Sequence, residues 1–457
     1  MLDLALIRAE AARVKAVLAR RGIRPEAVDA VMELDGRWAA RQEIREALCL
    51  RRRRVSEEHV RRKTAFRTGV DGDDGALDEP DLDRAGRKVA EELRAIEAEI
   101  AHLEAARDAA LLALPNLVMT DVPDDEAAPG PRPALPPWPK PFAPLGHWDL
   151  VEMLGLAQPA TTSAGRGFLT WRGQGARLVR GLVRFMLDVH TREGGCEEIL
   201  APSVATRGAL TGSAHLPLLE GKMYAVAGPD DSAAPGDRSL TFAASSGNLS
   251  PVAAGDGDLF LAPRAEPHLA GLYAGRVLDA AALPIRLVSA GPALRRESHG
   301  GGAAGRGLLR LHEFQTVERY AFALPEQADE ELARAVRDAE TILSRLGVPY
   351  RQRLRPAPRL SHAAARTVDL DVWAPGVGEW LAVAALSNFT DYQARRTNTR
   401  CRDGRGRARL VHTVGGAAVA LPHLVAALLE NGQEADGSVR LPEALAEYVG
   451  GTVLARP

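Results

Sequence analysis

The segment 294–320 constrains the fold more than any other part of the chain, because it predicts two strands joined by a glycine-rich reversal. Alternation along the second strand places charged, polar and aromatic side chains on one face: Arg310, His312, Phe314, Thr316 and Glu318. Arg295 and Glu297, on the preceding strand, add a cation and an acceptor. Such a face can hold a phosphate, a flat base and a polar group together, so the pattern favours a nucleotide-binding antiparallel hairpin. A charged hairpin with one solvated face would have the same spacing.

The composition predicts an intracellular protein of two or three domains. The chain has 457 residues and a formal net charge of −2, so DNA is not an expected partner and any nucleic-acid contact must come from a local patch. Cys49, Cys196 and Cys401 are odd in number and far apart. We therefore expect neither a disulfide framework nor a metal-ligating cluster, which fits a reducing cytoplasm. No apolar run reaches membrane-spanning length, and the amino terminus lacks the design of a signal peptide.

The first 115 residues predict a long antiparallel helical hairpin. Apolar residues step by three and four along three stretches, which begin near Leu4, Val31 and Val89. The first stretch ends at Gly22, and the segment 68–83, rich in Gly and Asp, suits a turn between the other two. The simplest construction is a two-stranded coiled coil of limited length.

A run of basic residues follows the outbound arm of this predicted hairpin. It consists of Arg51, Arg52, Arg53, Arg54, Arg61, Arg62 and Lys63. Only Glu57 and Glu58 oppose it, so the run could neutralise several phosphates of a nucleic acid. A solvated helix face would have the same composition, and both interpretations stay open.

Residues 116–146 turn acidic and then proline-rich, which predicts an extended, semi-rigid linker. From residue 147 to residue 457 the pattern changes to mixed helices and strands. The predicted organisation is therefore an arm over 1–115, a linker over 116–146 and an α+β domain over 147–457.

The wording of 294–320 closely resembles the second signature motif of class II aminoacyl-tRNA synthetases, in the version carried by seryl-tRNA synthetases. Other segments resemble the same family: 114–117, 199–202 at the first motif, 387–396, and 412–443 at the third motif. The resemblance implies an α+β fold, in which a helical hairpin precedes a catalytic domain with an antiparallel sheet flanked by helices. It also implies a homodimer formed through the first motif.

The family reaction joins serine to ATP as an adenylate, with Mg²⁺, and then transfers the acyl group to serine tRNA. The resemblance implies that Arg295 holds the α-phosphate and the serine carboxylate, that Glu297 contacts the adenine edge and that Phe314 stacks on adenine. Arg310 joins the ATP site, and Glu318 accepts from the substrate hydroxyl or amine. It further implies that Glu266 and Asn388 bind serine. The basic run on the arm corresponds to the part that grips the tRNA.

Several positions depart from the family pattern, and they cluster on the chemistry. Arg264 replaces a threonine, Ala382 a metal- and ATP-binding glutamate, Ala385 a serine, Ala417 a hydroxyl residue and His423 the arginine over the triphosphate. An imidazole is shorter than a guanidinium and carries less charge near neutral pH. These replacements predict a degenerate ATP and serine pocket. Arg264 as a substitute cation and Glu379 as a substitute carboxylate are the compensations that the sequence offers.

Three functions remain open from the sequence. The first is a serine–tRNA ligase with an altered pocket. The second is a catalytically inactive paralogue that acts by binding tRNA or protein. The third is an adenylating enzyme for another small amino acid.

Overall fold

The computed structural model describes residues 1–68, 79–125, 135–226, 259–297 and 307–456, which form two compact units. One unit contains Asp3–Lys15 and Arg24–Leu114. The other contains Met1–Leu2, Ala16–Ile23 and Pro115–Pro457. Across the described ranges, no helix has both the length and the hydrophobicity needed to cross a membrane.

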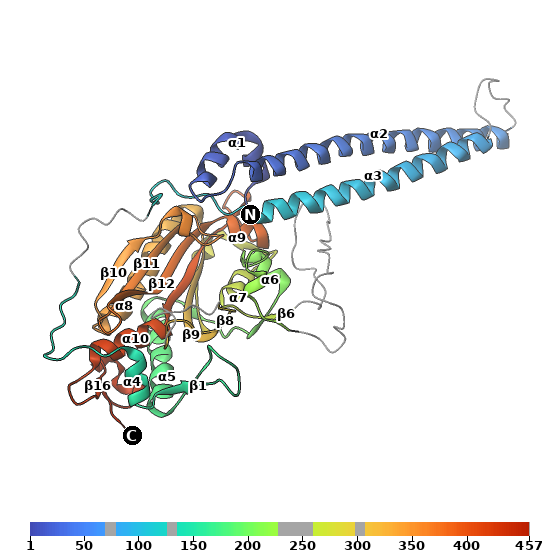
Figure 1. The fold of residues 1–457 in the computed structure, drawn as a ribbon. Coiled ribbons are helices and arrows are strands. Elements are labelled where there is room, and N and C mark those ends of the chain that lie inside the picture. Colours follow the sequence, from blue (N-terminus) through green and yellow to red (C-terminus); the bar gives the residue numbers. More distant parts are fainter. Residues whose placement is uncertain (69–78, 126–134, 227–258, 298–306, 457) are drawn as a thin grey trace. The chain divides into compact units, whose positions relative to one another are not determined.

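The helical unit is a long hairpin of α2 (Glu26–Thr68) and α3 (Glu79–Ala113), as Figure 1 shows. Val89, Leu93, Ile96 and Ile100 form its buried stripe on α3, where Trp38 and Leu48 of α2 pack against them. The predicted antiparallel hairpin is therefore confirmed, because burial follows the stepping of apolar residues. Helix α1 (Leu4–Ala19) ends before Gly22, whose φ of +74° is a conformation that glycine adopts without strain. Most of the turn expected over 68–83 lies outside the described residues.

The larger unit contains a seven-stranded sheet in the order β10-β11-β12-β15-β9-β8-β3. Its strands are β10 (Tyr350–Leu354), β11 (Arg366–Ala374), β12 (Glu379–Thr390), β15 (His412–Ala420), β9 (Glu313–Ala323), β8 (Ile285–Leu294) and β3 (Glu197–Glu198). Only the short edge strand β3 is parallel to its neighbour; the other pairs in this sheet are antiparallel. The predicted α+β class with an antiparallel sheet is confirmed.

The predicted hairpin of 294–320 is present as β8 and β9, but its second strand starts later than expected. Pairing runs from Ile285 opposite Phe322 to Leu294 opposite Glu313. Arg310 and His312 precede β9. The His312 carbonyl still accepts from the Arg295 N–H (2.9 Å), but the His312 N–H donates to the carbonyl of Gly167 (2.9 Å), so regular pairing ends there. The glycine-rich reversal at 298–306 lies outside the described residues.

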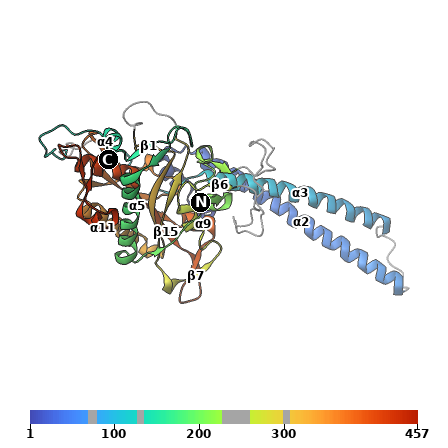
Figure 2. The ribbon, with the colours of Figure 1, turned by 90° about the horizontal axis from the view of Figure 1, so that it is seen from below.

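Three helices cover one face of the sheet: α5 (Gly173–Asp188), α8 (Ala328–Arg345) and α10 (Leu421–Gly432). Apolar side chains at alternate strand positions, among them Val317, Leu370 and Leu386, pack with these helices in one core. Alternation then turns Thr316, Glu318 and Asp369 to the opposite face, although they are also buried. Figure 2 shows the short helix α11 (Ala446–Val449) beside α5, on the helical side.

Shorter elements complete the larger unit. The helices are α4 (His147–Met153), α6 (Arg207–Gly212), α7 (Glu266–Gly271) and α9 (Tyr392–Thr397). Four small sheets contain β1 (Ala157–Pro159) with β2 (Leu169–Trp171); β4 (Val204–Thr206), β6 (Leu259–Leu261) and β5 (Ala225–Val226); β7 (Val277–Asp279), β13 (Arg400–Arg402) and β14 (Ala408–Leu410); and β16 (Val439–Arg440) with β17 (Val453–Leu454).

The segment expected to start an extended linker is anchored at its first residues. Asn116 is buried, and its side-chain amide donates to the carbonyls of Ala363 and Phe389 (2.8 Å each). Its N–H donates to the carbonyl of His362 (2.9 Å). These hydrogen bonds hold this stretch against the sheet, so it does not behave as a free spacer. Residues 126–134 of the expected linker lie outside the described part.

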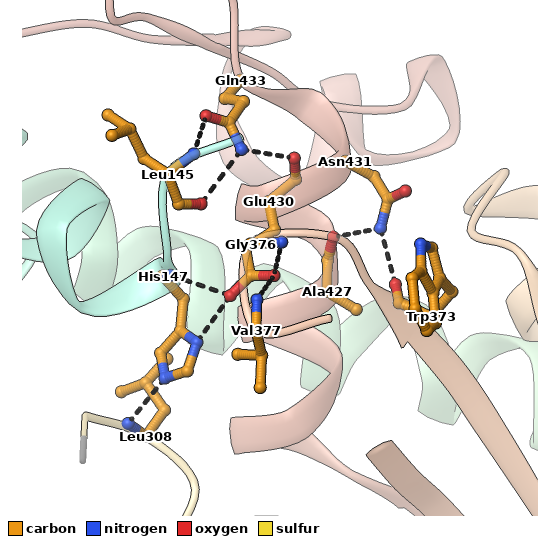
Figure 3. Close-up of polar contacts among 10 residues, drawn as sticks. All are labelled: Leu145, His147, Leu308, Trp373, Gly376, Val377, Ala427, Glu430, Asn431 and Gln433. Carbon is orange, nitrogen blue, oxygen red and sulfur yellow. Dashed lines mark hydrogen bonds and ion pairs between the residues drawn. The ribbon is translucent and has the colours of Figure 1, made fainter. Parts of the chain in front are cut away.

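A fully buried carboxylate, Glu430 on α10, joins three segments of the larger unit (Figure 3). It accepts hydrogen bonds from the N–H and the Nδ1–H of His147 (2.8 Å each), from Gly376 N (2.7 Å) and from Val377 N (3.1 Å). Nε2 of His147 faces the N–H of Leu308 (3.3 Å), which fixes the neutral tautomer with its proton on Nδ1. Helix α10, the start of α4 and the β11–β12 turn are thereby tied together, and His147 extends the network to the segment before β9.

We expect Glu430→Ala to lower the free energy of unfolding of the larger unit by about 3–5 kcal/mol, because it leaves several buried donors without an acceptor. Urea unfolding followed by circular dichroism measures this loss. Glu434→Ala is the matched control: Glu434 is much more exposed and pairs with Lys140 at 3.5 Å, so its removal should cost less than about 1 kcal/mol. Equal losses in the two variants would contradict the role given to Glu430.

Candidate functional site

A cavity of about 610 Å³ lies over the polar face of the sheet. Its floor comes from β9, β12 and β15, and its walls come from the segments around Lys222, Arg264 and Leu309. The lining includes most of the predicted site residues, namely Arg295, Glu297, Arg310, Phe314 and Glu318, together with the departures Arg264, Ala382, Ala385, Ala417 and His423. The structure thus brings together residues that are far apart in the sequence. Glu266 lies directly behind the lining, whereas Asn388 is not part of the site.

One wall carries a chain of alternating charges. Arg295 Nε lies 2.5 Å from Glu297 Oε1, and Arg310 Nε lies 3.3 Å from Glu297 Oε2. Half of the Arg295 side chain is exposed, so its guanidinium can turn to an anion in the cavity. Glu297 therefore holds two cations side by side in the wall of the cavity that Phe314 also lines.

Three aromatic residues position this wall, and sequence reasoning identified only one of them. The Glu297 N–H donates to Nδ1 of His312 (3.1 Å), and the Tyr224 hydroxyl contacts the same nitrogen (3.1 Å). Phe168 stacks on the His312 ring with a centroid distance of 5.2 Å. Phe168 and Tyr224 lie more than eighty residues from His312 in the chain, so no local pattern could have indicated them.

At the inner end of the cavity, two buried carboxylates share one guanidinium. Arg264 Nη1 lies 3.4 Å from Glu266 Oε2, and Arg264 Nε lies 3.4 Å from Glu318 Oε1. The N–H of Glu266 donates to Glu318 Oε2 (2.8 Å), and the Gln393 amide donates to Glu266 Oε1 (2.8 Å). Burial raises the pKa of Glu318 to about 7, although Arg264 partly offsets the shift. Burial also lowers the pKa of the neighbouring His215 to about 4, so its ring is neutral at pH 7.

Alanine methyl groups form much of the remaining floor. Ala385 pairs with Ala417, and Ala417 pairs with Glu318, across three adjacent strands. A β-bulge at Val383 turns both Ala382 and Ala385 toward the cavity, which strict alternation would not allow. His423 lies at the rim, where its ring nitrogens face the carbonyls of Ala382 (2.6 Å) and Leu309 (3.3 Å).

Asn388 and Glu379 lie away from this cavity. Asn388 is three residues beyond Ala385 on β12 and so faces the helical side, where its amide donates to Asp329 Oδ1 on α8 (3.0 Å). Glu379 opens β12 opposite Ala374 and is exposed. The compensation expected from Glu379 is therefore not realised, while Arg264 does bring a cation into the cavity, although toward two carboxylates.

The basic run on α2 is exposed at Arg51 to Arg54. Arg51 pairs with Glu92 of α3 (3.5 Å), Arg53 with Glu57 (2.8 Å) and Arg62 with Glu58 (3.1 Å). These exposed pairs hold the side chains weakly. The side chain of Lys63 lies outside the described part of the chain.

Glu318 should make folding stability depend on pH. Between pH 4.5 and about 7 the unfolded chain loses the Glu318 proton while the folded chain keeps it, so the free energy of unfolding falls as pH rises through this window, by about 3 kcal/mol. We expect Glu318→Gln to remove this part of the dependence when unfolding is measured at pH 5 and pH 8. Glu313→Gln, at the exposed start of the same strand, should leave it in place. If the free energy of unfolding changes equally between pH 5 and pH 8 in wild type and in Glu318→Gln, the raised pKa assigned to Glu318 is wrong.

The sequence of the chain matches known protein families and relatives. Residues 1–118 match the seryl-tRNA synthetase N-terminal domain, and residues 252–432 match the tRNA synthetase class II core domain (G, H, P, S and T). The serine–tRNA ligase of Gemmatimonas aurantiaca is 38% identical over 466 residues and covers 100% of both chains. That of Pelotomaculum thermopropionicum is 35% identical and covers 99% of both.

Solved structures agree with this relationship. The structure of seryl-tRNA synthetase from Pyrococcus horikoshii, complexed with ATP, matches the whole chain with a TM-score of 0.82 and 28% identity. The cytoplasmic serine–tRNA ligase of Naegleria fowleri, in complex with AMP, shares the fold with a TM-score of 0.77 and 23% identity, over 100% of this chain. With relatives above 30% identity along its full length, the chain belongs to the seryl-tRNA synthetase family of class II aminoacyl-tRNA synthetases.

Proposed function

We propose that this protein binds ATP in the cavity and serine tRNA on its helical hairpin, and that it activates serine slowly. The observation that carries the proposal is the cavity itself, where two arginines and an aromatic ring lie beside a floor of alanines. The full-length similarity to serine–tRNA ligases, and to a structure complexed with ATP, supports the same activity.

In the proposed reaction, adenine stacks on Phe314 and the phosphates lie near Arg295 and Arg310. The serine carboxylate attacks the α-phosphorus, and the bond from that phosphorus to its bridging oxygen breaks, which releases pyrophosphate. A hydroxyl of the terminal adenosine of the tRNA then attacks the carbonyl carbon, and AMP leaves. The arginines stabilise negative charge that develops on the phosphate, and no covalent nucleophile of the protein is needed.

Magnesium has little to bind on the protein side of this cavity. Among the described lining residues the carboxylates are Glu297 and Glu318, and each is in an ion pair with an arginine. Ala382 offers only a methyl group at the position where the family has a glutamate. The side chains present therefore do not fit a protein-held Mg²⁺ ion, and we derive no step through it.

The degenerate pocket is the finer part of the proposal. Ala382 and His423 remove a carboxylate and a permanent cation from the rim, and a preorganised charge on a transferring phosphate is typically worth about 3 kcal/mol, or about a hundredfold in rate. Ala385 and Ala417 provide no polar atom for a serine hydroxyl. The same alanines favour two alternatives, a paralogue that acts by binding tRNA or protein, and an adenylating enzyme for another small amino acid.

We also infer that two copies associate through the region of the first motif. The edge strand β3 ends just before Leu200, whose side chain is almost completely exposed (92%). An exposed leucine beside an unpaired strand edge suits a surface that a second copy covers.

Restoring both lost charges should raise activity. We expect Ala382→Glu with His423→Arg to increase serine-dependent ATP–pyrophosphate exchange at least tenfold over wild type, because the two changes return an acid and a cation to the phosphate end of the cavity. The control, Ala382→Gln with His423→Gln, introduces similar volume without charge and should give no gain. If the variant Ala382→Glu with His423→Arg folds and binds ATP but shows no gain in exchange, the result favours the paralogue that acts by binding.

The arm should carry the affinity for tRNA. We expect Arg52, Arg53 and Arg54, changed together to Gln, to weaken tRNA binding about tenfold near 0.15 M salt and to reduce the slope of log affinity against log salt, because fewer counterions are released. Filter binding at several salt concentrations measures both. Arg402, Arg405 and Arg407, exposed on the larger unit and changed in the same way, remove equal charge and should have a small effect. Equal losses of tRNA affinity in the two triple variants would show that the arm is not part of the tRNA-binding surface.

A further inference from the structure

His215 presents a neutral imidazole to the cavity, and it has no role in the reaction proposed above. Its ring lines the cavity and lies close enough to Glu266 and Arg264 for their charges to act on its pKa in opposite directions. Burial is the largest effect and lowers this pKa to about 4, so the ring carries no charge near pH 7. A neutral imidazole has one donor nitrogen and one acceptor nitrogen, and its tautomer decides which of them a ligand can use.

Ser213 fixes the tautomer of this ring. The Ser213 hydroxyl oxygen lies 3.0 Å from the Ala209 carbonyl oxygen and 3.1 Å from that of Leu210. It also lies 2.9 Å from Nδ1 of His215. Carbonyl oxygens only accept, so the single hydroxyl hydrogen points to one of them, and Nδ1 of His215 donates to the Ser213 oxygen. Nε2 is then the acceptor nitrogen. Among the described residues it has no hydrogen-bond partner, so its lone pair is available to a ligand in the cavity.

The turn that carries His215 is held in a defined geometry. Ala214 has a φ of +67°, a left-handed conformation that few residues other than glycine adopt, so the surrounding contacts must maintain it. The His215 N–H donates to a carbonyl of α6 (2.9 Å). The Ser213 carbonyl accepts from the Gln393 amide (3.1 Å), which also donates to Glu266 (2.8 Å). The turn is therefore fixed to α6 on one side and to the buried carboxylates on the other.

The acceptors near this turn suit different parts of an amino acid. Glu318 Oε1 is buried, faces Arg264 at 3.4 Å and has no hydrogen-bond partner among the described residues. A carboxylate gains more from a cationic donor than from a neutral one, so an α-ammonium group belongs with this carboxylate. Nε2 of His215 is a neutral acceptor and suits a hydroxyl. Ala385 and Ala417 on the floor offer only methyl groups and do not compete for that hydroxyl.

We propose that Nε2 of His215 accepts a hydrogen bond from the side-chain hydroxyl of the serine substrate, and that this contact distinguishes serine from alanine. The inference rests on the proposed activation of serine in the same cavity, and it names the residue that recognises the side chain. Alanine leaves the desolvated acceptor without a donor, which typically costs about tenfold or more in affinity. His215 thereby supplies the polar atom that the alanines of the floor do not.

Two stable adenylate analogues test this contact. Seryl sulfamoyl adenosine and alanyl sulfamoyl adenosine differ only in the side-chain hydroxyl. Calorimetric titration of the full chain should show that wild type binds the seryl ligand more tightly, by about tenfold or more. His215→Asn keeps a polar atom for Ser213 but has none at the position of Nε2, so the two affinities should come within about twofold of each other. His215→Gln places an acceptor near the position of Nε2 and should keep most of the preference.

The outcomes separate this inference from the function beneath it. AMP is titrated in parallel as a nucleotide without an acyl group, and its failure to bind wild type overturns the nucleotide site together with the inference. If AMP binds but wild type binds the two acyl ligands equally, the inference alone is overturned. Preference of wild type for the alanyl ligand overturns it as well, and favours the adenylating enzyme for another small amino acid.

The variants test the residue itself. A seryl preference that persists in folded His215→Asn overturns the inference, because another group then recognises the hydroxyl. Equal losses of the preference in His215→Asn and His215→Gln leave His215 a structural role only and also overturn it. His215→Leu, which has a similar volume and no polar atom, takes the place of His215→Asn if that variant does not fold.

Discussion

The buried carboxylate of Glu430 is the interaction on which the candidate site depends. Burying a carboxylate is costly unless its oxygens are fully hydrogen-bonded, and here donors from His147, Gly376 and Val377 meet that requirement. Through the other ring nitrogen of His147, the network reaches Leu308, directly before the residues that form the cavity wall. Helix α10 carries both Glu430 and the rim residue His423. One satisfied charge thus helps to position the wall around Leu309 and the rim at His423.

At the cavity, charged side chains form small clusters of opposite sign. Glu297 bridges Arg295 and Arg310, and Arg264 bridges Glu266 and Glu318. The lining residue Arg355 binds Asp369, which lies outside the lining, at 2.5 Å. A ligand gains from such a site only where its own charges can replace an internal partner. The outer pair, with Arg295 half exposed, can exchange its partner for a phosphate. The inner cluster is more deeply buried, and Glu318 Oε1 there has no hydrogen-bond partner among the described residues, so the two ends of the cavity differ in charge and in exposure.

The sequence predicted the features that depend on local periodicity. Stepping by three and four residues predicted the helical hairpin, and alternation correctly placed Phe314, Thr316 and Glu318 together on the cavity side. It could not predict where the β8–β9 ladder ends, because that is set by the contact of His312 with Gly167. Nor could it predict the bulge at Val383, which changes the facing of neighbouring alanines. Tyr224 was not identified, and Gln393 was noted only within the segment 387–396, because only the tertiary fold brings these two residues to the site.

Ala385 and Ala417 show how this fold separates the residues that pack its core from those that face the cavity. Ala385 and Ala417 sit in the centre of the sheet, where backbone hydrogen bonds between β12, β15 and β9 hold the strands whatever the side chain is. Their side chains face the cavity and not the helical core, so the side chain at these positions does not contribute to the packing with α5, α8 and α10. Arg264, on the cavity side, pairs with Glu266 and Glu318, two buried carboxylates that a nearby cation stabilises. Packing with the helices therefore takes place on one face of the sheet, and contacts with the cavity on the other.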